Sequence, residues 1–95
     1  MKVRFLAPAQ LELDEAFAWY ETEHKGLGSR FVGEVHNSLN RIVRYPHSCK
    51  PITTVLRRCP MRKFSYMIIY GVHADTIVVV AVAHMHRKPA YWQDR

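Results

Sequence analysis

The stretch "TIVVVAVAH", residues 76–84, decides the fold. Successive side chains of an extended strand point to opposite faces, and here both faces are apolar. The pattern therefore predicts a central strand of a sheet, with helices packed on one of its faces. The apolar run from Ile77 to Ala83 is also far too short to cross a bilayer, so no membrane contact is expected.

Two segments before this strand, residues 52–58 and 63–72, are rich in β-branched and aromatic residues. "GVHAD" at 71–75 supplies a turn between the second segment and the last strand, which predicts an antiparallel meander of three strands. Near the start of the chain, "KVRFL" at 2–6 alternates, with Val3 and Phe5 on one face. It predicts a short strand that Pro8 stops, and its place in the sheet stays open.

Helical periodicity fills the region between the first strand and the meander. The first apolar stripe consists of Ala9, Leu13, Ala16, Phe17 and Tyr20. The intervening acidic residues are Glu12, Asp14, Glu15, Glu21 and Glu23. They predict an amphipathic helix with an acidic solvent face. "KGLG" at 25–28 breaks this helix, and a second helix ends before Pro46. Its stripe consists of Phe31, Val35, Leu39 and Ile42.

A short glycine-containing turn between two helices predicts a helical hairpin. Ninety-five residues are enough for one modest core and leave no room for a second domain. The expected architecture is a single α+β domain over residues 1–95, in the order β-α-α-β-β-β, with a helical hairpin packed on a mainly antiparallel sheet.

The charge is unevenly distributed along the chain. Residues 1–34 carry four basic and six acidic side chains, whereas residues 35–95 carry ten basic and two acidic ones, for a net charge of +6. A basic second half favours an anionic partner, either nucleic acid or an acidic protein segment. Cys49 and Cys59 have no CxxC spacing and no secretory leader precedes them, which predicts reduced thiols in a cytoplasmic protein.

The C-terminal stretch "HMHRKPAYWQDR", residues 84–95, is dense in chemically active side chains. His84 and His86 would share a face of an extended strand, as some metal ligands do. No acidic side chain or cysteine lies close by to complete such a site, so neither a metal nor a cofactor is expected and His84 is interpreted as structural. Tyr91 and Trp92 are expected to cover the second face of the sheet or the helix ends.

Basic side chains of the meander and of the C-terminal stretch form a predicted binding surface. It consists of Arg58, Arg62, Lys63, Arg87, Lys88, Trp92 and Arg95. The alternative interpretation is a solvated strand edge, since surface charge is common.

The order of these elements and four motifs resemble the RelE/ParE superfamily of bacterial toxins over essentially the whole chain. The motifs are "LAPAQLELDEAFAWYE", "GLGSRFVGEV", "FSYMIIYGV" and "VVAVAHMHRKPAYWQDR". The last of these is similar to the ParE-like branch. The resemblance implies a toxin of a type II toxin–antitoxin system of the plasmid stabilisation type. It implies inhibition of DNA gyrase, neutralisation by a cognate antitoxin, and contact with operator DNA only through that antitoxin.

The superfamily also contains RelE-like enzymes, which cleave messenger RNA on the ribosome. Their pattern places arginines at positions that are Met67 and Met85 here, and methionine can neither transfer a proton nor neutralise a phosphate. We therefore expect a protein that is not an enzyme. The alternatives are an RNA endonuclease or a degenerate member that only binds its antitoxin. The catalytic candidates of a nuclease would be Tyr91, Arg87, Arg62, Lys63, His84 and His86.

Overall fold

The computed structural model describes residues 1–95, and β5 (Thr76–His84) is the central strand that the sequence predicts. Strand β4 (Tyr66–His73) pairs with it antiparallel, followed by β3 (Arg57–Pro60) and the two-residue strand β2 (Lys50–Pro51). Strand β1 (Lys2–Phe5) lies parallel to β5 on its other side, giving the sheet order β1-β5-β4-β3-β2. The α+β architecture and the meander are confirmed, and the place of the first strand is settled.

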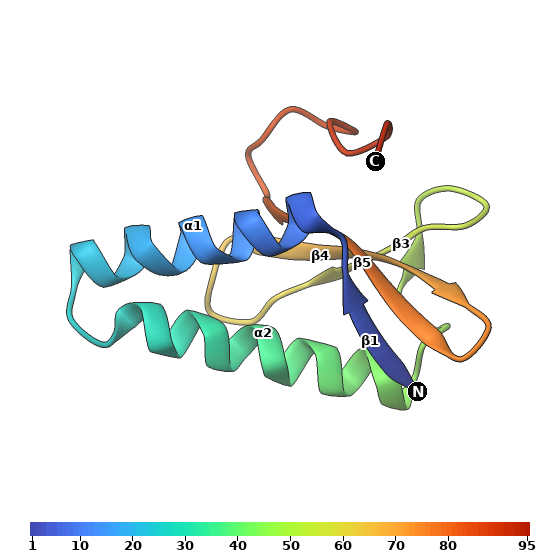
Figure 1. The fold of residues 1–95 in the computed structure, drawn as a ribbon, viewed down its shortest axis with the longest axis horizontal. Helices are drawn as coiled ribbons and strands as arrows, with labels where there is room; N and C mark the ends of the chain where they lie inside the picture. The colour runs from blue at the N-terminus through green and yellow to red at the C-terminus, as the bar shows by residue number, and fades with distance from the viewer.

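The helices α1 (Ala7–Glu23) and α2 (Leu27–Arg44) form the predicted hairpin and cover one face of the sheet (Figure 1). The sequence predicts that Pro8 stops the first strand. In the structure β1 ends before it, and Pro8 lies in the first turn of α1. The first turn has no intrahelical acceptor for its N–H groups, so proline is tolerated there. Neither helix combines the length and the apolarity that a membrane span requires.

The hairpin turn depends on a carboxylate and on two glycines. The Glu21 carboxylate accepts hydrogen bonds from the backbone N–H groups of Gly26 (2.9 Å) and Gly28 (3.0 Å). Gly26 has a φ of 88°, which favours glycine. At Gly28 the helices approach so closely that a Cβ atom would lie 2.6 Å from the carbonyl oxygen of Phe17. The two glycines of "KGLG" therefore suit the geometry of the turn, Gly26 through its left-handed φ and Gly28 through the close approach of the helices.

The main core lies between the helices and the sheet. The predicted stripe of α2 is fully confirmed, because Phe31, Val35, Leu39 and Ile42 are all buried there. The stripe of α1 is confirmed in part, since Ala9 and Ala16 are buried but Phe17 is 38% exposed. The outer face of α1 is also not simply acidic, because Leu11 and Trp19 are 57% and 59% exposed.

The other face of the sheet has a second, smaller core. Ile69, Val80, Ala81 and Ala83 pack there against Trp92. Figure 1 shows the C-terminal segment leaving the end of β5 and turning back as a separate layer. The prediction that Trp92 covers this face is confirmed. Strand β5 is apolar on both sides because the helices cover one side and this segment covers the other.

The predicted strand over residues 52–58 is wrong for its first five residues. Residues 52–56 form a turn, in which the Thr53 hydroxyl accepts hydrogen bonds from the N–H groups of Val55 (3.2 Å) and Leu56 (2.9 Å). A side-chain acceptor of this kind competes with the ladder of a sheet. The predicted strand at 63–72 begins only at Tyr66, because Lys63 has a left-handed φ of 70°.

Candidate functional site

The carboxylate of Glu12, on α1, is the centre of a polar cluster that fastens the C-terminal segment. Its Oε1 accepts hydrogen bonds from the Val82 N–H (3.0 Å) and the Arg95 guanidinium (2.7 Å). Its Oε2 accepts one from the Tyr91 hydroxyl (2.5 Å) and a second from Arg95 (3.0 Å). Arg95 also donates to the carbonyl oxygen of Val80 (3.1 Å). One carboxylate therefore joins α1, β5 and the end of the chain.

The cluster is largely shielded from water. The side chains of Glu12 and Arg95 are only 10% and 18% exposed. Burial raises the pKa of the Tyr91 hydroxyl well above its usual value, and the hydrogen bond to Glu12 raises it further. The pKa of Arg95 is raised mainly by its hydrogen bond to Glu12. Tyr91 therefore keeps its proton at neutral pH and holds it toward Glu12.

Arg87 lies at the solvent-exposed side of the cluster, over the ring of Tyr91. Its guanidinium carbon lies 4.2 Å from the centre of the Tyr91 ring, and that of Arg95 lies 5.0 Å from it, which are cation–π distances. An Arg87 nitrogen is also 4.0 Å from Glu12 Oε2, but the Arg87 side chain is 57% exposed. The contact between Arg87 and Glu12 is therefore screened by water and weak, which leaves the Arg87 guanidinium available to a partner.

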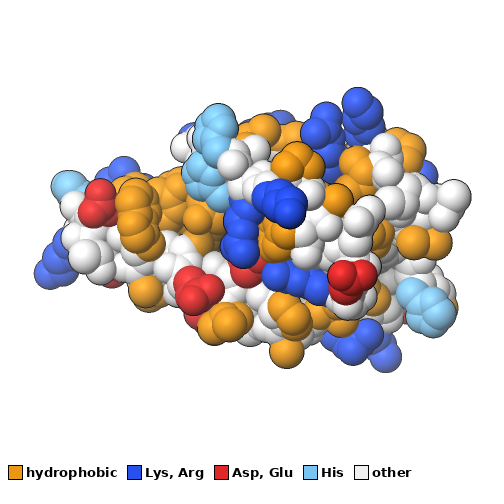
Figure 2. Space-filling view, turned by 90° about the horizontal axis from the view of Figure 1, so that it is seen from above, with side chains coloured by type: hydrophobic (Ala, Val, Ile, Leu, Met, Phe, Trp, Pro, Cys, Tyr) orange, Lys and Arg blue, Asp and Glu red, His pale blue; other side chains and the backbone are white.

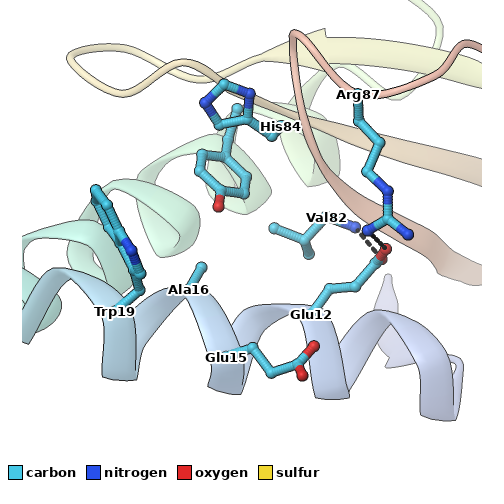
Figure 3. Close-up of a pocket in the computed structure, with 8 residues that line it drawn as sticks. Glu12, Glu15, Ala16, Trp19, Val82, His84 and Arg87 are labelled. Atoms are coloured by element: carbon cyan, nitrogen blue, oxygen red, sulfur yellow. Dashed lines mark hydrogen bonds and ion pairs between the residues drawn. The ribbon is translucent and has the colours of Figure 1, made fainter.

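The first cavity lies between α1 and the ends of β4 and β5, with a volume of about 240 Å³. Figure 3 shows Glu12 pointing into it toward Arg87 and Val82, whereas Glu15 lines its edge with its carboxylate turned away from Arg87. Trp19 forms a wall of this cavity, and His84 lies across from it.

Glu12 and His84, which line the first cavity, already accept hydrogen bonds from within the chain. His84 Nδ1 accepts a hydrogen bond from the His86 N–H (3.1 Å). Burial raises the pKa of Tyr66, whose ring packs edge-on against His84 at 5.0 Å. Glu12 is fully engaged. The structural role of His84 stays a prediction, and the structure brings no three potential metal-ligating side chains together.

The second cavity, of about 320 Å³, opens on the face of the sheet that the C-terminal segment covers. Met67 and Met85 line it together with Arg58, Arg87 and Trp92. The sequence predicts that basic side chains of the meander meet the C-terminal stretch, and Arg58 and Arg87 meet here. Two cations beside thioethers and an indole can bind an acidic, partly apolar segment, but nothing among these five side chains can act as a base at neutral pH.

The other basic residues of the predicted surface lie elsewhere. Arg62 and Lys63 line a cavity beside α2 instead, and Lys63 is 3.9 Å from Glu34. Lys88 is exposed on the C-terminal segment, and Arg95 is turned inward onto Glu12. Figure 2 views the molecule from the side of the C-terminal segment. On this face basic and apolar side chains are interleaved.

The sequence pattern predicts Glu12 on the acidic solvent face of the first helix, and the structure contradicts this, because the Glu12 side chain is turned inward. A signal was present in the spacing, since Glu12 lies three residues after Ala9 and four before Ala16, which are both buried. Residues three and four apart share a helix face. An acidic residue inside an apolar stripe predicts a buried carboxylate that needs a partner.

The sequence matches the family described as the ParE toxin of type II toxin–antitoxin system, parDE, over residues 3–89. The fold is similar to a solved chain described as "Chromosomal ParDE TA system from P. aeruginosa", with a TM-score of 0.66 and 10% identity, covering 90% of this chain and 97% of that chain. No curated protein is similar enough in sequence to match. The structural likeness concerns the fold, and the sequence match spans nearly the whole domain. The chain therefore belongs to the ParE toxin family of type II toxin–antitoxin systems.

Proposed function

We propose that this toxin acts in the cytoplasm by binding and inhibiting DNA gyrase, as its resemblance to the ParE-like branch implies, and that it performs no hydrolysis. The observation that supports this proposal is the composition of the second cavity. Its two cations, Arg58 and Arg87, flank Met67 and Met85 rather than groups that transfer protons. Such a surface suits recognition of a partner.

The contacts of Tyr91 also disfavour a nuclease. An RNA endonuclease of this superfamily needs a side chain that takes or gives a proton at the ribose or the phosphate. The Tyr91 hydroxyl already donates to Glu12 at 2.5 Å, and its pKa is raised rather than lowered. The tyrosine that matches the nuclease pattern therefore serves to hold the C-terminal segment.

A cognate antitoxin is the second partner that we propose. An acidic amphipathic segment that is disordered when free can fold across a basic and apolar surface. Trp19 and Leu11 supply exposed apolar area on α1, Arg58 supplies charge on the sheet, and Arg87 supplies charge on the C-terminal segment. Operator DNA would be reached only through this antitoxin.

A supercoiling assay tests the proposed target. The purified toxin should inhibit gyrase, and Arg58→Ala should weaken that inhibition, by about 1.5–3 kcal/mol if the contact is desolvated and by less than about 1 kcal/mol if it is exposed. Arg44→Ala, an exposed arginine at the end of α2, removes the same charge and should change little.

The same proteins added to translating ribosomes should leave the message intact. If message cuts appear at defined codon positions and disappear in a folded Tyr91→Phe variant, RNA cleavage rather than gyrase inhibition is the activity.

Co-expression with the small acidic protein of a neighbouring reading frame tests the proposed antitoxin. A salt-sensitive complex is expected, because opposite charges speed association at low salt. No complex, together with harmless expression of the toxin alone, would refute the antitoxin proposal.

A further inference from the structure

Cys49 and Cys59 face each other across the hairpin formed by β2 and β3. The register pairs Lys50 with Arg58 and Pro51 with Arg57, so Cys49 lies opposite Cys59 one position further along. Residues directly opposite in an antiparallel pair point to the same face of the sheet. Cys59 belongs to the main core and Cys49 packs against that core, and both are free thiols.

The hydrogen-bond pattern sets the spacing of the pair. The N–H of Ile52 donates to the carbonyl oxygen of Leu56 at 2.9 Å, in the same register. Bonded and non-bonded pairs alternate along an antiparallel ladder, so the two cysteines occupy a non-hydrogen-bonded position, where Cα atoms are about 4.5 Å apart. Disulfides span Cα separations of about 4.4–6.8 Å, so no large backbone movement is needed to join the sulfurs.

Neighbouring side chains hold the strand of Cys49 in place. One nitrogen of Arg57 donates to the carbonyl oxygens of Cys49 (2.7 Å) and His47 (2.8 Å). The Tyr70 hydroxyl donates to the carbonyl oxygen of Pro46 at 2.8 Å. The segment before β2 is therefore tied to β3 and β4 by three side-chain hydrogen bonds, which fixes the first thiol against the second.

The two thiols differ in access. Cys59 is 4% exposed, whereas Cys49 is half-buried and can be reached by a small oxidant. The pKa of Cys59 is raised to about 11, mainly by burial and also by the neighbouring Cys49, with Arg41 opposing both effects. Cys59 remains protonated at neutral pH, so Cys49 is the thiol that an external disulfide meets first.

We propose that Cys49 and Cys59 are a redox modification site that closes into an intramolecular disulfide by exchange with a low-molecular-weight disulfide such as oxidised glutathione. The Cys49 thiolate attacks one glutathione sulfur, forms a mixed disulfide and releases one glutathione thiolate. Cys59 loses its proton to solvent, and its sulfur attacks Cys49 Sγ and releases the second glutathione. Two protein thiols are oxidised and one glutathione disulfide is reduced to two thiols.

The disulfide would close the loop over residues 49–59, which contains β2, the Thr53 turn and all of β3 except Pro60. Arg58 lies within this loop and lines the second cavity. Oxidation therefore restrains the edge of the sheet that presents Arg58, whether or not gyrase is the target.

The experiment uses the folded protein in glutathione buffers of increasing oxidised fraction, followed by thiol labelling with a maleimide and intact mass measurement. The wild-type monomer should lose both thiols together, and its Tm should rise by on the order of 10 °C relative to the reduced form. Cys49→Ser should keep its remaining buried thiol and show no such rise.

Three results would overturn the proposal. The first is oxidation that occurs only in urea-unfolded wild-type protein. The second is a stable glutathione adduct on Cys49 with Cys59 still free, and the third is a disulfide that joins two chains.

Discussion

Replacement of Glu12 by alanine is the sharpest test of the polar cluster. The change removes one carboxylate that accepts hydrogen bonds from Val82, Tyr91 and Arg95. A hydrogen bond to a charged group contributes about 1.5–3 kcal/mol, and a buried donor left without a partner costs about 1–3 kcal/mol. These contributions overlap, so simple addition overstates the total.

We expect a loss of about 3–5 kcal/mol in the free energy of unfolding, which is the range for breaking a buried ion pair by removing one partner. That loss is a large part of the roughly 5–15 kcal/mol that stabilises an ordinary domain. Urea unfolding followed by circular dichroism measures it. Glu12→Gln should cost less, because the amide oxygen still accepts one hydrogen bond.

Glu15→Ala is the matched control, because Glu15 lies one turn further along α1 and its side chain points away from the cluster. It should change the free energy of unfolding by no more than about 0.5 kcal/mol. A double-mutant cycle of Glu12→Ala with Arg95→Ala should give a coupling of about 1–3 kcal/mol. If Glu12→Ala matches Glu15→Ala, or if the coupling is zero, the carboxylate does not fasten the C-terminal segment.

Three further substitutions test the packing and the buried tyrosine. Gly28→Ala should cost about 1–3 kcal/mol because its Cβ would lie 2.6 Å from a backbone oxygen, whereas Gly33→Ala, with open space, should stabilise by about 0.5–1 kcal/mol; equal effects would contradict the close helix contact. Trp92→Ala should cost about 3–5 kcal/mol in thermal melts, and a loss below 1 kcal/mol would mean that the indole is not a core residue. Burial raises the pKa of Tyr70, so above about pH 10 the unfolded chain releases a proton that the folded chain keeps, and stability falls by about 1.4 kcal/mol per pH unit for this group. Between pH 10 and 11 the unfolded tyrosine is only partly ionised, so in urea titrations the wild type should lose about 1 kcal/mol more stability than Tyr70→Phe, and equal losses would refute this account.

The elements that were predicted well are those with an unbroken pattern. Strand β5 coincides with the predicted range of residues 76–84, and the stripe of α2 is buried throughout. The errors lie where a single side chain or backbone angle overrides propensity. Thr53 turns a β-branched segment into a loop, and Lys63 delays β4 through its left-handed conformation. A propensity average over neighbouring residues does not detect either effect.

The candidate site was less predictable because its contacts are distant in sequence. Tyr91 and Arg95 are 79 and 83 residues from Glu12. The sequence indicates that the C-terminal stretch is rich in basic and aromatic residues. It contains no local signal that Arg95 binds the Glu12 carboxylate while the Arg87 side chain stays exposed. The same limit applies to Arg62, which is near Arg58 in sequence but lines a different cavity.

The cluster around Glu12 also links stability to the proposed binding surface. Strand β5 is apolar on both faces, and Trp92 covers the face opposite the helices. Trp92 belongs to the segment that Glu12 fastens, and the same segment presents Arg87 to the second cavity. A substitution that frees this segment should therefore both expose apolar strand surface and displace Arg87, a cation of the proposed binding surface. Arg58 lies on β3 instead, so its removal should affect binding with little change in stability, and comparison of Arg58→Ala with Glu12→Ala separates recognition from folding.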